Sequence, residues 1–427
     1  MATSAILLNK SPSIAALLTL VLIASMLSAC DSSPIEQIKA LTEDKYPVAN
    51  MPDEPLETPL EINIEPKRLA MTSSWSAGVK DDGTLWTWGT SGLLRETKTG
   101  QDPTPRQVEG VNDAVAVSGG SGHMLLLRKD GTVWGWGSNS KSQIDPNDED
   151  TFIEELRQIE GIGNVIDINA GSHISFFVTK SREVFVLGKN EAGFASDKRT
   201  VLLEKPTKVE DLYDIIKIDG ESDSVLALNS QGDLFAFSET NLTRTSKKFI
   251  ENTQRNYKIN KINFLSKVTD FSSGYANIVL LDDGTVWTWG DGEYSAQGAT
   301  SGKIIEPQRV NGLSKVVKIN SVSANTTNHD LYVWGTYVYR YQSSSLGSTK
   351  DYIQRPVRIA QNITVKQYGT GGFADYSFID EEGNAWMWGD KSDRGQWGTG
   401  EITEDYMPKE FVLSLHQSLF NIHSISN

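Results

Sequence analysis

One hydrophobic and aromatic pattern recurs along the chain after residue 68. It begins as an apolar strand, turns at Asp-Gly or Glu-Gly and ends in Trp-x-Trp-Gly, and its clearest copies are residues 79–89, 127–137, 280–290 and 379–389. Weaker copies lie at residues 178–188, 228–238 and 331–335. The closing positions 89, 137, 188, 238, 290, 335 and 389 are 45 to 54 residues apart, so the pattern indicates seven repeats with a period near fifty.

A fainter element follows the copies of this pattern. It consists of proline or a polar residue, a basic residue with valine, a turn, and a second short apolar strand. Examples are residues 105–120, 206–220, 307–322 and 356–369. Each repeat is therefore predicted to hold about four short strands.

The residues of the main pattern explain its geometry. Asp-Gly between apolar strands favours a tight hairpin, because both residues tolerate the positive φ that such turns require. Residues two apart lie on one face of a strand, so each Trp-x-Trp pair forms an aromatic wall that another sheet must cover. The repeat residues expected to be structural are Gly83, Trp86, Trp88, Gly131, Trp134, Trp136, Gly284, Trp287, Trp289, Gly383, Trp386 and Trp388.

These repeats predict the fold class. A four-stranded sheet with an aromatic wall cannot bury its own face, whereas seven such sheets stacked radially share a continuous core and leave few exposed edges. We therefore expect an all-β protein whose residues 67–427 form a seven-bladed β-propeller of four-stranded blades. Residues 69–73 and 419–425 both carry a short apolar strand, and the pattern leaves open which of these ends closes the ring.

The pattern resembles the regulator-of-chromosome-condensation repeat. The resemblance rests on the period, the Asp-Gly turn, the Trp-x-Trp-Gly ending, and the short segments Gly-x-Gly-His and Gly-Ser-His that end at His123 and His173. It covers about residues 68–427 and implies a propeller that binds other molecules. In the other copies the histidine is replaced, which indicates that His123 and His173 are structural; the replacements are Trp75, Ser224, Ala276 and Asp375.

The first thirty residues differ from the repeats. Lys10 precedes an apolar run over residues 14–27 that is short for a permanent transmembrane helix, and the segment ends in Leu-Ser-Ala-Cys at Cys30. This ending resembles a bacterial lipobox, which implies that residues 1–29 are a lipoprotein signal peptide and that Cys30 is acylated. Cys30 is the only cysteine of the chain, and an incidental thiol is the less favoured interpretation.

An acylated Cys30 would bind the protein to a lipid bilayer. Asp31 resembles the residue that keeps enteric lipoproteins at the periplasmic face of the inner membrane; where that rule does not apply, the outer membrane or the cell surface is expected. Residues 30–66 are rich in proline and acidic side chains, so we expect a disordered tether. A loop packed on the propeller is the second interpretation.

Charge and residue content disfavour two classes of function. The formal net charge of −15, without a long run of Lys or Arg, repels phosphate backbones and disfavours nucleic-acid binding. The chain has five histidines and shows no hydrolase, zinc-protease or phosphate-loop motif, so we expect no catalysis, cofactor or bound metal. The acidic run at residues 145–150 lacks the pattern of a calcium loop, and a solvated acidic loop is favoured over a calcium site.

Two aromatic groups are the candidate partner-binding residues. Tyr337, Tyr339 and Tyr341 alternate after the truncated sixth copy and could form a binding surface, although the core of a distorted blade is favoured. Trp397 lies in a loop after the last hairpin and is the best candidate for an exposed aromatic residue.

The sequence favours a binding protein of the cell envelope. We expect a monomeric propeller that acts as a protein-interaction platform for an unidentified envelope protein. The resemblance includes a nuclear exchange factor for a small GTPase, whose activity we do not transfer to an exported chain, and a secreted bacterial inhibitor of β-lactamase. The alternatives are therefore an inhibitor of an envelope enzyme or an outer-membrane assembly factor, and less favoured a glycan-binding protein or hydrolase.

Overall fold

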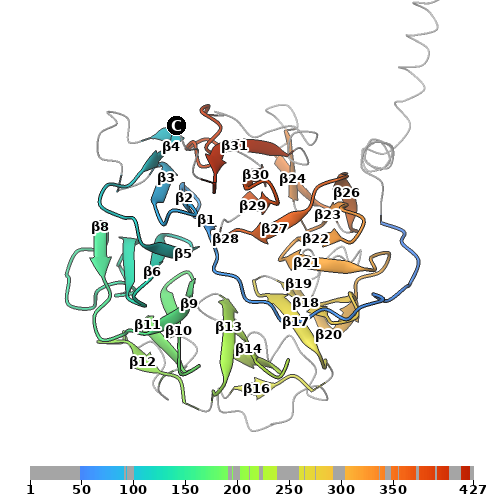
Figure 1. The fold of residues 1–427 in the computed structure, drawn as a ribbon, viewed down its shortest axis with the longest axis horizontal. Coiled ribbons are helices and arrows are strands. Elements are labelled where there is room, and N and C mark those ends of the chain that lie inside the picture. The colour runs from blue at the N-terminus through green and yellow to red at the C-terminus, as the bar shows by residue number, and fades with distance from the viewer. Residues whose placement is uncertain are drawn as a thin grey trace, which may run out of the picture. The chain divides into compact units, whose positions relative to one another are not determined.

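The computed structural model describes residues 49–90, 93, 101–190, 195, 202–210, 212–220, 225–237, 259–263, 265–274, 276–291, 303–335, 337–341, 348–353, 355–371, 375–389, 392–402 and 415–423. These residues belong to the unit Ala49–Asn427, and their regular secondary structure is β-strand. Six sheets of four strands and one of five are arranged in a ring (Figure 1). The predicted seven-bladed propeller of four-stranded blades is confirmed.

The first four blades follow one another along the chain, each running from the centre of the ring outwards. The first blade consists of β1 (Leu69–Met71), β2 (Trp75–Val79), β3 (Leu85–Gly89) and β4 (Asp102–Gln107). The second consists of β5 (Ala114–Gly119), β6 (His123–Arg128), β7 (Val133–Ser138) and β8 (Phe152–Gln158). The third consists of β9 (Val165–Ala170), β10 (Ile174–Thr179), β11 (Val184–Gly188) and β12 (Thr207–Lys208), and the fourth of β13 (Ile215–Gly220), β14 (Val225–Asn229), β15 (Leu234–Phe237) and β16 (Asn260–Lys261).

The remaining blades contain one insertion. The fifth blade consists of β17 (Val268–Ser272), β18 (Ala276–Leu281), β19 (Val286–Asp291) and β20 (Lys303–Arg309). The sixth consists of β21 (Val316–Asn320), β22 (Ser323–Thr326), β23 (Leu331–Val333) and β26 (Val357–Ala360), with the separate hairpin β24 (Tyr337–Tyr341) and β25 (Ser348–Tyr352) inserted. The seventh consists of β27 (Val365–Tyr368), β29 (Asp375–Asp380), β30 (Asn384–Gly389) and β31 (His416–Asn421), and β28 (Thr370–Gly371) pairs with β1.

The turn between β2 and β3 shows why the repeat carries Asp-Gly. Gly83 adopts a φ of +80°, and its N–H donates to the carbonyl of Lys80 at 3.0 Å. The carboxylate of Asp82 accepts hydrogen bonds from the N–H of Thr84 at 2.9 Å and from its hydroxyl at 2.7 Å. Glycine thus supplies the positive φ, while the aspartate fixes the turn as an acceptor and does not itself take a positive φ.

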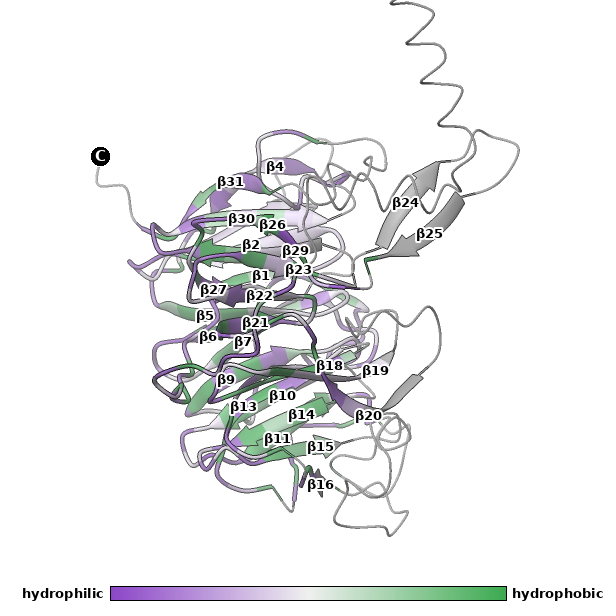
Figure 2. Cartoon of the chain, turned by 90° about the vertical axis from the view of Figure 1, so that its right-hand side faces the viewer, coloured by the Kyte–Doolittle hydropathy of each residue, from purple (hydrophilic) through white to green (hydrophobic). Residues whose placement is uncertain are grey.

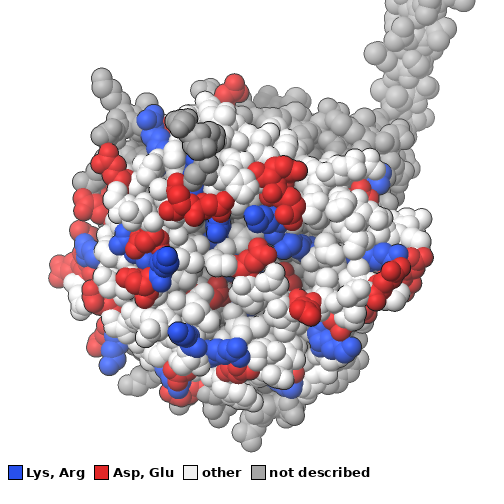
Figure 3. Space-filling view, in the orientation of Figure 1, with Lys and Arg blue, Asp and Glu red and all other residues white. Residues whose placement is uncertain are grey.

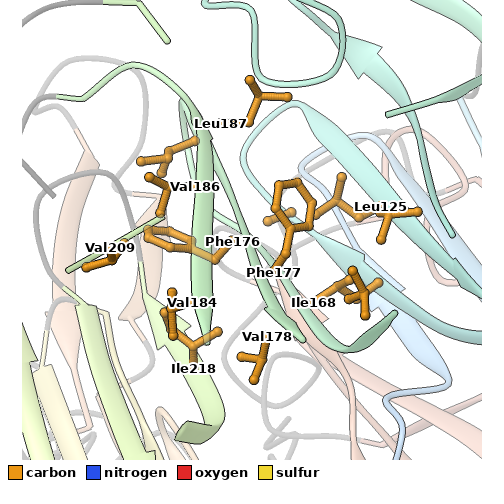
Figure 4. Close-up of a cluster of buried hydrophobic side chains, with 14 of the residues drawn as sticks. Leu125, Ile168, Phe176, Phe177, Val178, Val184, Val186, Leu187, Val209 and Ile218 are labelled. Carbon is orange, nitrogen blue, oxygen red and sulfur yellow. The ribbon is translucent and has the colours of Figure 1, made fainter. Parts of the chain in front are cut away.

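The hydrophobic core lies between neighbouring blades. All six residues of β10 are buried, because adjacent blades cover both faces of this sheet. Phe177 points toward Leu125 of β6, whereas Phe176 points to the opposite side of the sheet, near Val186 and Val209 (Figure 4). Figure 2 shows that strands such as β10, β11 and β14 are mainly hydrophobic, whereas the turns are hydrophilic.

The tryptophans of the repeat divide into two groups. The second tryptophan of each clear Trp-x-Trp pair has an exposed fraction of 0%; these residues are Trp88, Trp136, Trp289 and Trp388. The first tryptophan of each pair is half-buried; these residues are Trp86, Trp134, Trp287 and Trp386. The second position therefore supplies most of the core predicted from the aromatic wall, since burial of a large ring contributes in proportion to the area removed from water.

The ring closes at the seam between the seventh and first blades, and neither of these blades combines strands from both ends of the chain. β31 is the outer strand of the seventh blade, β1 is the inner strand of the first, and β1 pairs with β28 only at Ala70 and Met71. Across the seam, the hydroxyl of Ser76 donates to the carbonyl of Gln396 at 2.7 Å. Both ends of the propeller sequence therefore contribute whole strands, one to each side of the seam.

Phe420 of β31 completes this seam. Its ring stacks on Trp88, with the ring centroids 5.2 Å apart. A Cβ atom added at Gly78 of β2 would lie 2.4 Å from Cζ of Phe420, so the phenyl ring fills the space above this glycine. The main-chain N–H of Asp81 also donates to the carbonyl of Ile422 at 2.8 Å. The last strand of the chain is thus packed directly on the first blade.

Residues 49–66, called the strap below, lie along the propeller (blue in Figure 1). The N–H of Ala49 donates to the carbonyl of Pro356 at 2.7 Å, and Gln367 Nε2 donates to the carbonyl of Pro66 at the same distance. Apolar strap residues such as Leu56 and Ile62 are half-buried, whereas its acids are exposed. Residues 49–66 are therefore bound to the propeller and do not form the free tether expected from the sequence. Residues 30–48 of the predicted tether lie outside the described residues.

Candidate functional site

The two ends of the propeller carry different segments. Because the strands of a blade are antiparallel, the Asp-Gly turns and the connections between blades lie at one end, which we call the turn face. The loops that follow Trp-x-Trp-Gly, such as residues 139–151, lie at the opposite end, which we call the loop face. The strap crosses the turn face toward β1 (Figure 1). On the side shown in Figure 3, acidic and basic side chains are interspersed.

A cavity of about 500 Å³ lies within the ring. Strap residues line one part of it, among them Leu60, Asn63 and Ile64. The ends of the inner strands line another part with small residues such as Gly119 and Gly220. The volume falls within the range of small-molecule sites, which is about 300–1,000 Å³.

A charged network lines this cavity. Lys217 pairs with the carboxylate of Asp270 and donates to the carbonyl of Phe271 at 2.7 Å. Burial alone would lower the pKa of Lys217, but the negative charges of Asp270 and Asp219 outweigh burial and raise it. Burial raises the pKa of Asp167, although the positive charge of Lys217 opposes this effect. The lysine is therefore charged, and its positive charge offsets part of the negative charge of the nearby carboxylates.

Asn169 offers one open acceptor in the same cavity. Its Nδ2 donates to Asp219 Oδ1 at 3.0 Å, and its buried Oδ1 accepts no hydrogen bond within the part of the chain that the structure describes. Ser272 and the N–H of Ser273 donate to Asp219 Oδ2 at 3.2 and 3.1 Å. The cavity can thus hold water or a small hydrogen-bond donor. No group of three His, Cys, Asp or Glu among the described residues could hold a metal ion.

These cavity residues were not among those predicted from the sequence. Their signal is the alternation of polar positions on the inner strands: Asp167 with Asn169 on β9, and Lys217 with Asp219 on β13. Residues two apart in a strand face the same side, so both positions of each pair point toward the cavity that they line. A polar residue at every second position of an otherwise buried strand could have predicted this lining.

Trp397 does not have the exposed position predicted for it. Its exposed fraction is 1%, and its ring stacks on His416 with the centroids 4.8 Å apart. The N–H of Arg394 donates to Gln396 Oε1 at 3.0 Å, as the N–H of Lys141 donates to Gln143 Oε1 at 2.9 Å in the second blade. Trp397 therefore occupies the position of the buried Ile144 and is a core residue, not a partner-binding one.

The tyrosine run forms a hairpin outside the blade sheets. β24 pairs with β25 from Tyr337 opposite Tyr352 to Tyr341 opposite Ser348. β24 is not part of the sheet of the sixth blade, which consists of β21, β22, β23 and β26, and the prediction that these tyrosines are core residues stays a prediction. Tyr337, Tyr339 and Tyr341 alternate along β24 and so occupy positions on one face of the hairpin.

The acidic run on the loop face is held by an arginine. Arg157 NH1 lies 2.8 Å from carboxylate oxygens of both Asp145 and Asp148. Asn139 Nδ2 donates to the carbonyl of Asp145 at 2.8 Å, which fixes the start of the run. The hydrogen bonds from Arg157 raise its own pKa, and the guanidinium supplies the positive charge at these two carboxylates. The arrangement agrees with the predicted acidic loop.

His123 lies in a buried junction between the second and third blades. Its Nε2 is 3.0 Å from Ser175 Oγ, and the Ser175 hydroxyl donates to the carbonyl of Gln143 at 2.7 Å. Ser175 therefore accepts from the imidazole, and His123 is neutral with its proton on Nε2. Burial lowers the pKa of His123 to about 3. These contacts join the second and third blades, so His123 has a structural role. His173 is half-buried.

The predicted lipidation site, Cys30, lies outside the described residues. Within those residues, no helix has the length and apolar character needed to cross a membrane. The lipid anchor and the envelope location therefore stay predictions from the sequence.

Comparison with known proteins places one segment in a repeat family. Residues 114–143 match the family model described as the regulator of chromosome condensation (RCC1) repeat. The segment extends from β5 to the loop after β7 and includes both Trp134 and Trp136. This match supports the repeat family that the sequence resembles.

Curated relatives include the E3 ubiquitin-protein ligase HERC2 from Homo sapiens and Mus musculus. Each is 27% identical over 328 residues, which cover 71% of this chain and 7% of the ligase. The chain therefore matches a small part of the length of these relatives.

Solved structures with similar folds include a yeast protein and a human protein. Prp20p from Saccharomyces cerevisiae has a TM-score of 0.59 and 18% identity, with coverage of 82% of this chain and 87% of that chain. Human WBSCR16 has a TM-score of 0.51 and 18% identity, with coverage of 88% and 90%. At this identity the likeness shows the fold and supports the RCC1-type propeller.

Proposed function

We propose that this protein is a lipid-anchored protein of the cell envelope that binds another protein through the loop face of its propeller. The observation that carries the proposal is the difference between the two faces: the strap crosses the turn face, whereas the loop face presents the long connections between strands. RCC1-type propellers that bind proteins support an interaction role. The yeast relative Prp20p has binding properties to Gsp1p and histones and is seen bound to Kap60.

Exposed apolar side chains of the loop face support this proposal. Phe152 begins β8 opposite Ser138, at the loop-face end of β7, and has an exposed fraction of 43%. Leu202, which is bridged to Lys189 just after β11, has an exposed fraction of 44%. Together with the tyrosine positions of the β24–β25 hairpin, they are the partner-binding candidates that take the place of Trp397. Large apolar groups at an exposed surface contribute most to protein interfaces when a partner buries them.

Two alternative functions would also act by binding a protein. Inhibition of an envelope enzyme would use the same loop face, and assembly of outer-membrane proteins would use it on a different partner. A hydrolase is less favoured because two carboxylates that line the central cavity are already bound: Asp219 by Asn169 and two serines, and Asp270 by Lys217. Glycan binding remains the outcome to pursue if no protein partner is found.

The test is crosslinking in cells followed by affinity capture of the tagged protein from solubilised membranes. A variant with Phe152→Ala, Leu202→Ala and Tyr339→Ala is expected to lose a discrete envelope protein that the unmodified chain captures. The matched control is Tyr213→Ala, because Tyr213 is 69% exposed but lies in the connection between β12 and β13 on the turn face. Equal capture by all three proteins, or loss with the Tyr213 variant alone, would overturn the proposal.

The lipid anchor has its own test. Cys30→Ser removes the thiol that would carry the acyl chains, so the variant is expected to leave the membrane fraction. The measurement is fractionation combined with metabolic labelling by a palmitate analogue. A Ser28→Ala variant, which keeps a small residue before the cysteine, serves as control. Membrane association of the Cys30→Ser protein equal to that of the control would contradict acylation at this position.

A further inference from the structure

The strap lies on the turn face where the fifth and sixth blades meet, and the surface of these blades that contacts it is called the groove below. Four main-chain hydrogen bonds hold it there. The strap N–H groups donate to carbonyls of the two blades; the pairs are Ala49 with Pro356 at 2.7 Å, Met51 with Gly312 at 2.8 Å, Leu56 with Asp283 at 2.9 Å and Leu60 with Asp282 at 2.8 Å. The strap adopts no strand, so these bonds bind an extended segment by its main chain at separate points. Recognition of this kind does not require the bound segment to belong to the same chain.

Two basic side chains of the groove bind the acids of the strap. Arg309 donates to both carboxylate oxygens of Asp53, and its NH1 lies 2.6 Å from Oδ2. Lys315 Nζ lies 2.7 Å from Glu54 Oε2. The hydrogen bond from Arg309 lowers the pKa of Asp53, so this carboxylate is ionised at neutral pH. The groove therefore binds two consecutive acidic residues.

A glycine provides the seat for the apolar residue that follows. A Cβ atom added at Gly284 would lie 2.8 Å from Cγ of Leu56, so the side chain of Leu56 rests on the turn between β18 and β19. Leu56 is half-buried there, while Asp53 and Glu54 are exposed on their outer side. The bound segment thus presents a defined pattern: two acids, one further residue, and a leucine.

The ion pair of Arg309 differs from those of the corresponding cations in other blades. In the third, fourth and sixth blades the cation at the corresponding place on the outer strand pairs with an acid just after the hairpin turn of the same blade; these pairs are Lys208 with Glu183, Lys261 with Asp233, and Arg358 with Asp330. In the fifth blade that place after the turn is Thr285, and its hydroxyl is bound to Asp283. The acid that Arg309 binds, Asp53, belongs to the strap.

We propose that this groove is a recognition site for an extended acidic segment of a partner protein, and that the strap occupies it until such a segment replaces it. The ion pairs are at the surface, where each contributes little stability, and no β-ladder fixes the strap. Replacement is therefore compatible with the intact propeller. The site is on the turn face and does not depend on the proposed binding through the loop face.

The test measures binding of a fluorescent peptide with the sequence of residues 49–60 to the full chain. The strap is released by Asp53→Lys, Glu54→Lys and Leu56→Ser, all of which lie outside the blade cores. Because a competing strap lowers the fraction of open grooves, the peptide is expected to bind the released variant roughly tenfold or more tightly than the unmodified chain. Hydrogen exchange of residues 49–60 verifies that the strap has left the groove.

Charge reversal separates recognition from simple apolar contact. Arg309→Glu with Lys315→Glu, added to the released variant, is expected to abolish binding of the natural peptide. A peptide with lysine at positions 53 and 54 is expected to bind this doubly altered groove. Equal affinity of both peptides for both grooves, or no gain in affinity when the strap is released, would overturn the proposal.

A second measurement uses the unmodified chain and requires no folded variant. Saturating peptide is expected to accelerate hydrogen exchange in residues 49–60 while the strands of the fifth blade stay protected. The charge-reversed peptide is the control and is expected to leave exchange unchanged. Strap exchange that is unaffected by the natural peptide at saturation would show that the strap is a permanent part of the fold and would refute the proposed site.

Discussion

The seam that closes the ring and the internal junction between the second and third blades use the same contact. At the internal junction, Ser175 donates to the carbonyl of Gln143, 32 positions away in the chain. At the seam, Ser76 donates to the carbonyl of Gln396, 320 positions away. The seam adds the Phe420 ring on Trp88, which the internal junction does not require. A repeat contact thus suffices between consecutive blades, while contact between the two ends of the sequence is reinforced.

The physical reason is chain entropy. Joining segments far apart in sequence costs more conformational entropy than joining neighbours, although the cost grows only slowly with loop length. Adjacent blades are also held by their covalent connection, whereas the first and seventh blades meet only through side chains and short main-chain contacts. Substitutions at the seam and at an internal junction are therefore expected to differ in their effect on stability.

Truncation of a core tryptophan compares the seam, where Trp88 packs, with the internal junction between the first and second blades, where Trp136 packs. Trp88→Ala and Trp136→Ala each remove a fully buried indole, and each is expected to lower the free energy of unfolding by about 3–5 kcal/mol because a cavity remains. Denaturant titration measures the loss. Hydrogen exchange should separate the two variants: only Trp88→Ala is expected to expose β1 and β31. An unchanged melting temperature for either variant would contradict the assigned core position.

A methyl group at Gly78 tests the close packing of the seam. Gly78→Ala places Cβ 2.4 Å from Phe420, so the ring must move, and a loss of about 1–3 kcal/mol is expected from overpacking. Gly135→Ala is the matched control in the second blade, because its nearest contact is 3.0 Å, to Ile144. Thermal unfolding compares the two. A larger loss at Gly135 would show that the seam is the looser junction.

The buried neutral His123 at the internal junction should make the stability of the folded chain depend on pH. Burial holds the pKa of His123 at about 3, below its ordinary value of 6.5, so only the unfolded chain binds this proton between the two values. Its contribution to stability is complete above pH 6.5 and is lost as the pH falls through this window, by at most about 1.4 kcal/mol per pH unit. His123→Gln keeps a hydrogen-bonding side chain without this proton.

The measurement for His123 is urea unfolding at about pH 7 and about pH 5, where the expected linkage is already present. The loss of stability between these conditions is expected to be smaller for His123→Gln than for the unmodified chain. His173→Gln is the control, because that imidazole is only half-buried. Identical pH dependence of all three proteins would show that His123 is not a buried neutral group.

The ion pair at the seam should have the smallest effect. His423 Nδ1 lies 2.7 Å from Asp81 Oδ2, and both side chains are nearly half-exposed. The hydrogen bond from His423 lowers the pKa of Asp81, yet solvent screening limits the contribution of such a pair to less than about 1 kcal/mol. Asp81→Asn is therefore expected to change thermal unfolding only slightly. A loss as large as that of Gly78→Ala would mean that the ion pair, not the Phe420 packing, closes the ring.

The repeating part of this protein follows from local sequence patterns. The seven repeats, their hairpin turns and the buried second tryptophans follow from spacing within about fifty residues, because strand alternation and turn geometry are local properties. Gly83 had to be the residue with positive φ, and Trp136 had to be covered by a neighbouring sheet. These predictions required no knowledge of which blade met which.

Contacts between distant segments depend on the assembled ring. The sequence predicts Trp397 to be an exposed loop residue. It is buried because the loop folds back onto β31 and the first blade. The strap has the composition of a free tether, but its few apolar residues and acids are bound by a groove that two other blades form. Composition records what a segment contains, whereas burial depends on a complementary surface elsewhere in the chain, and only the assembled ring shows whether that surface exists.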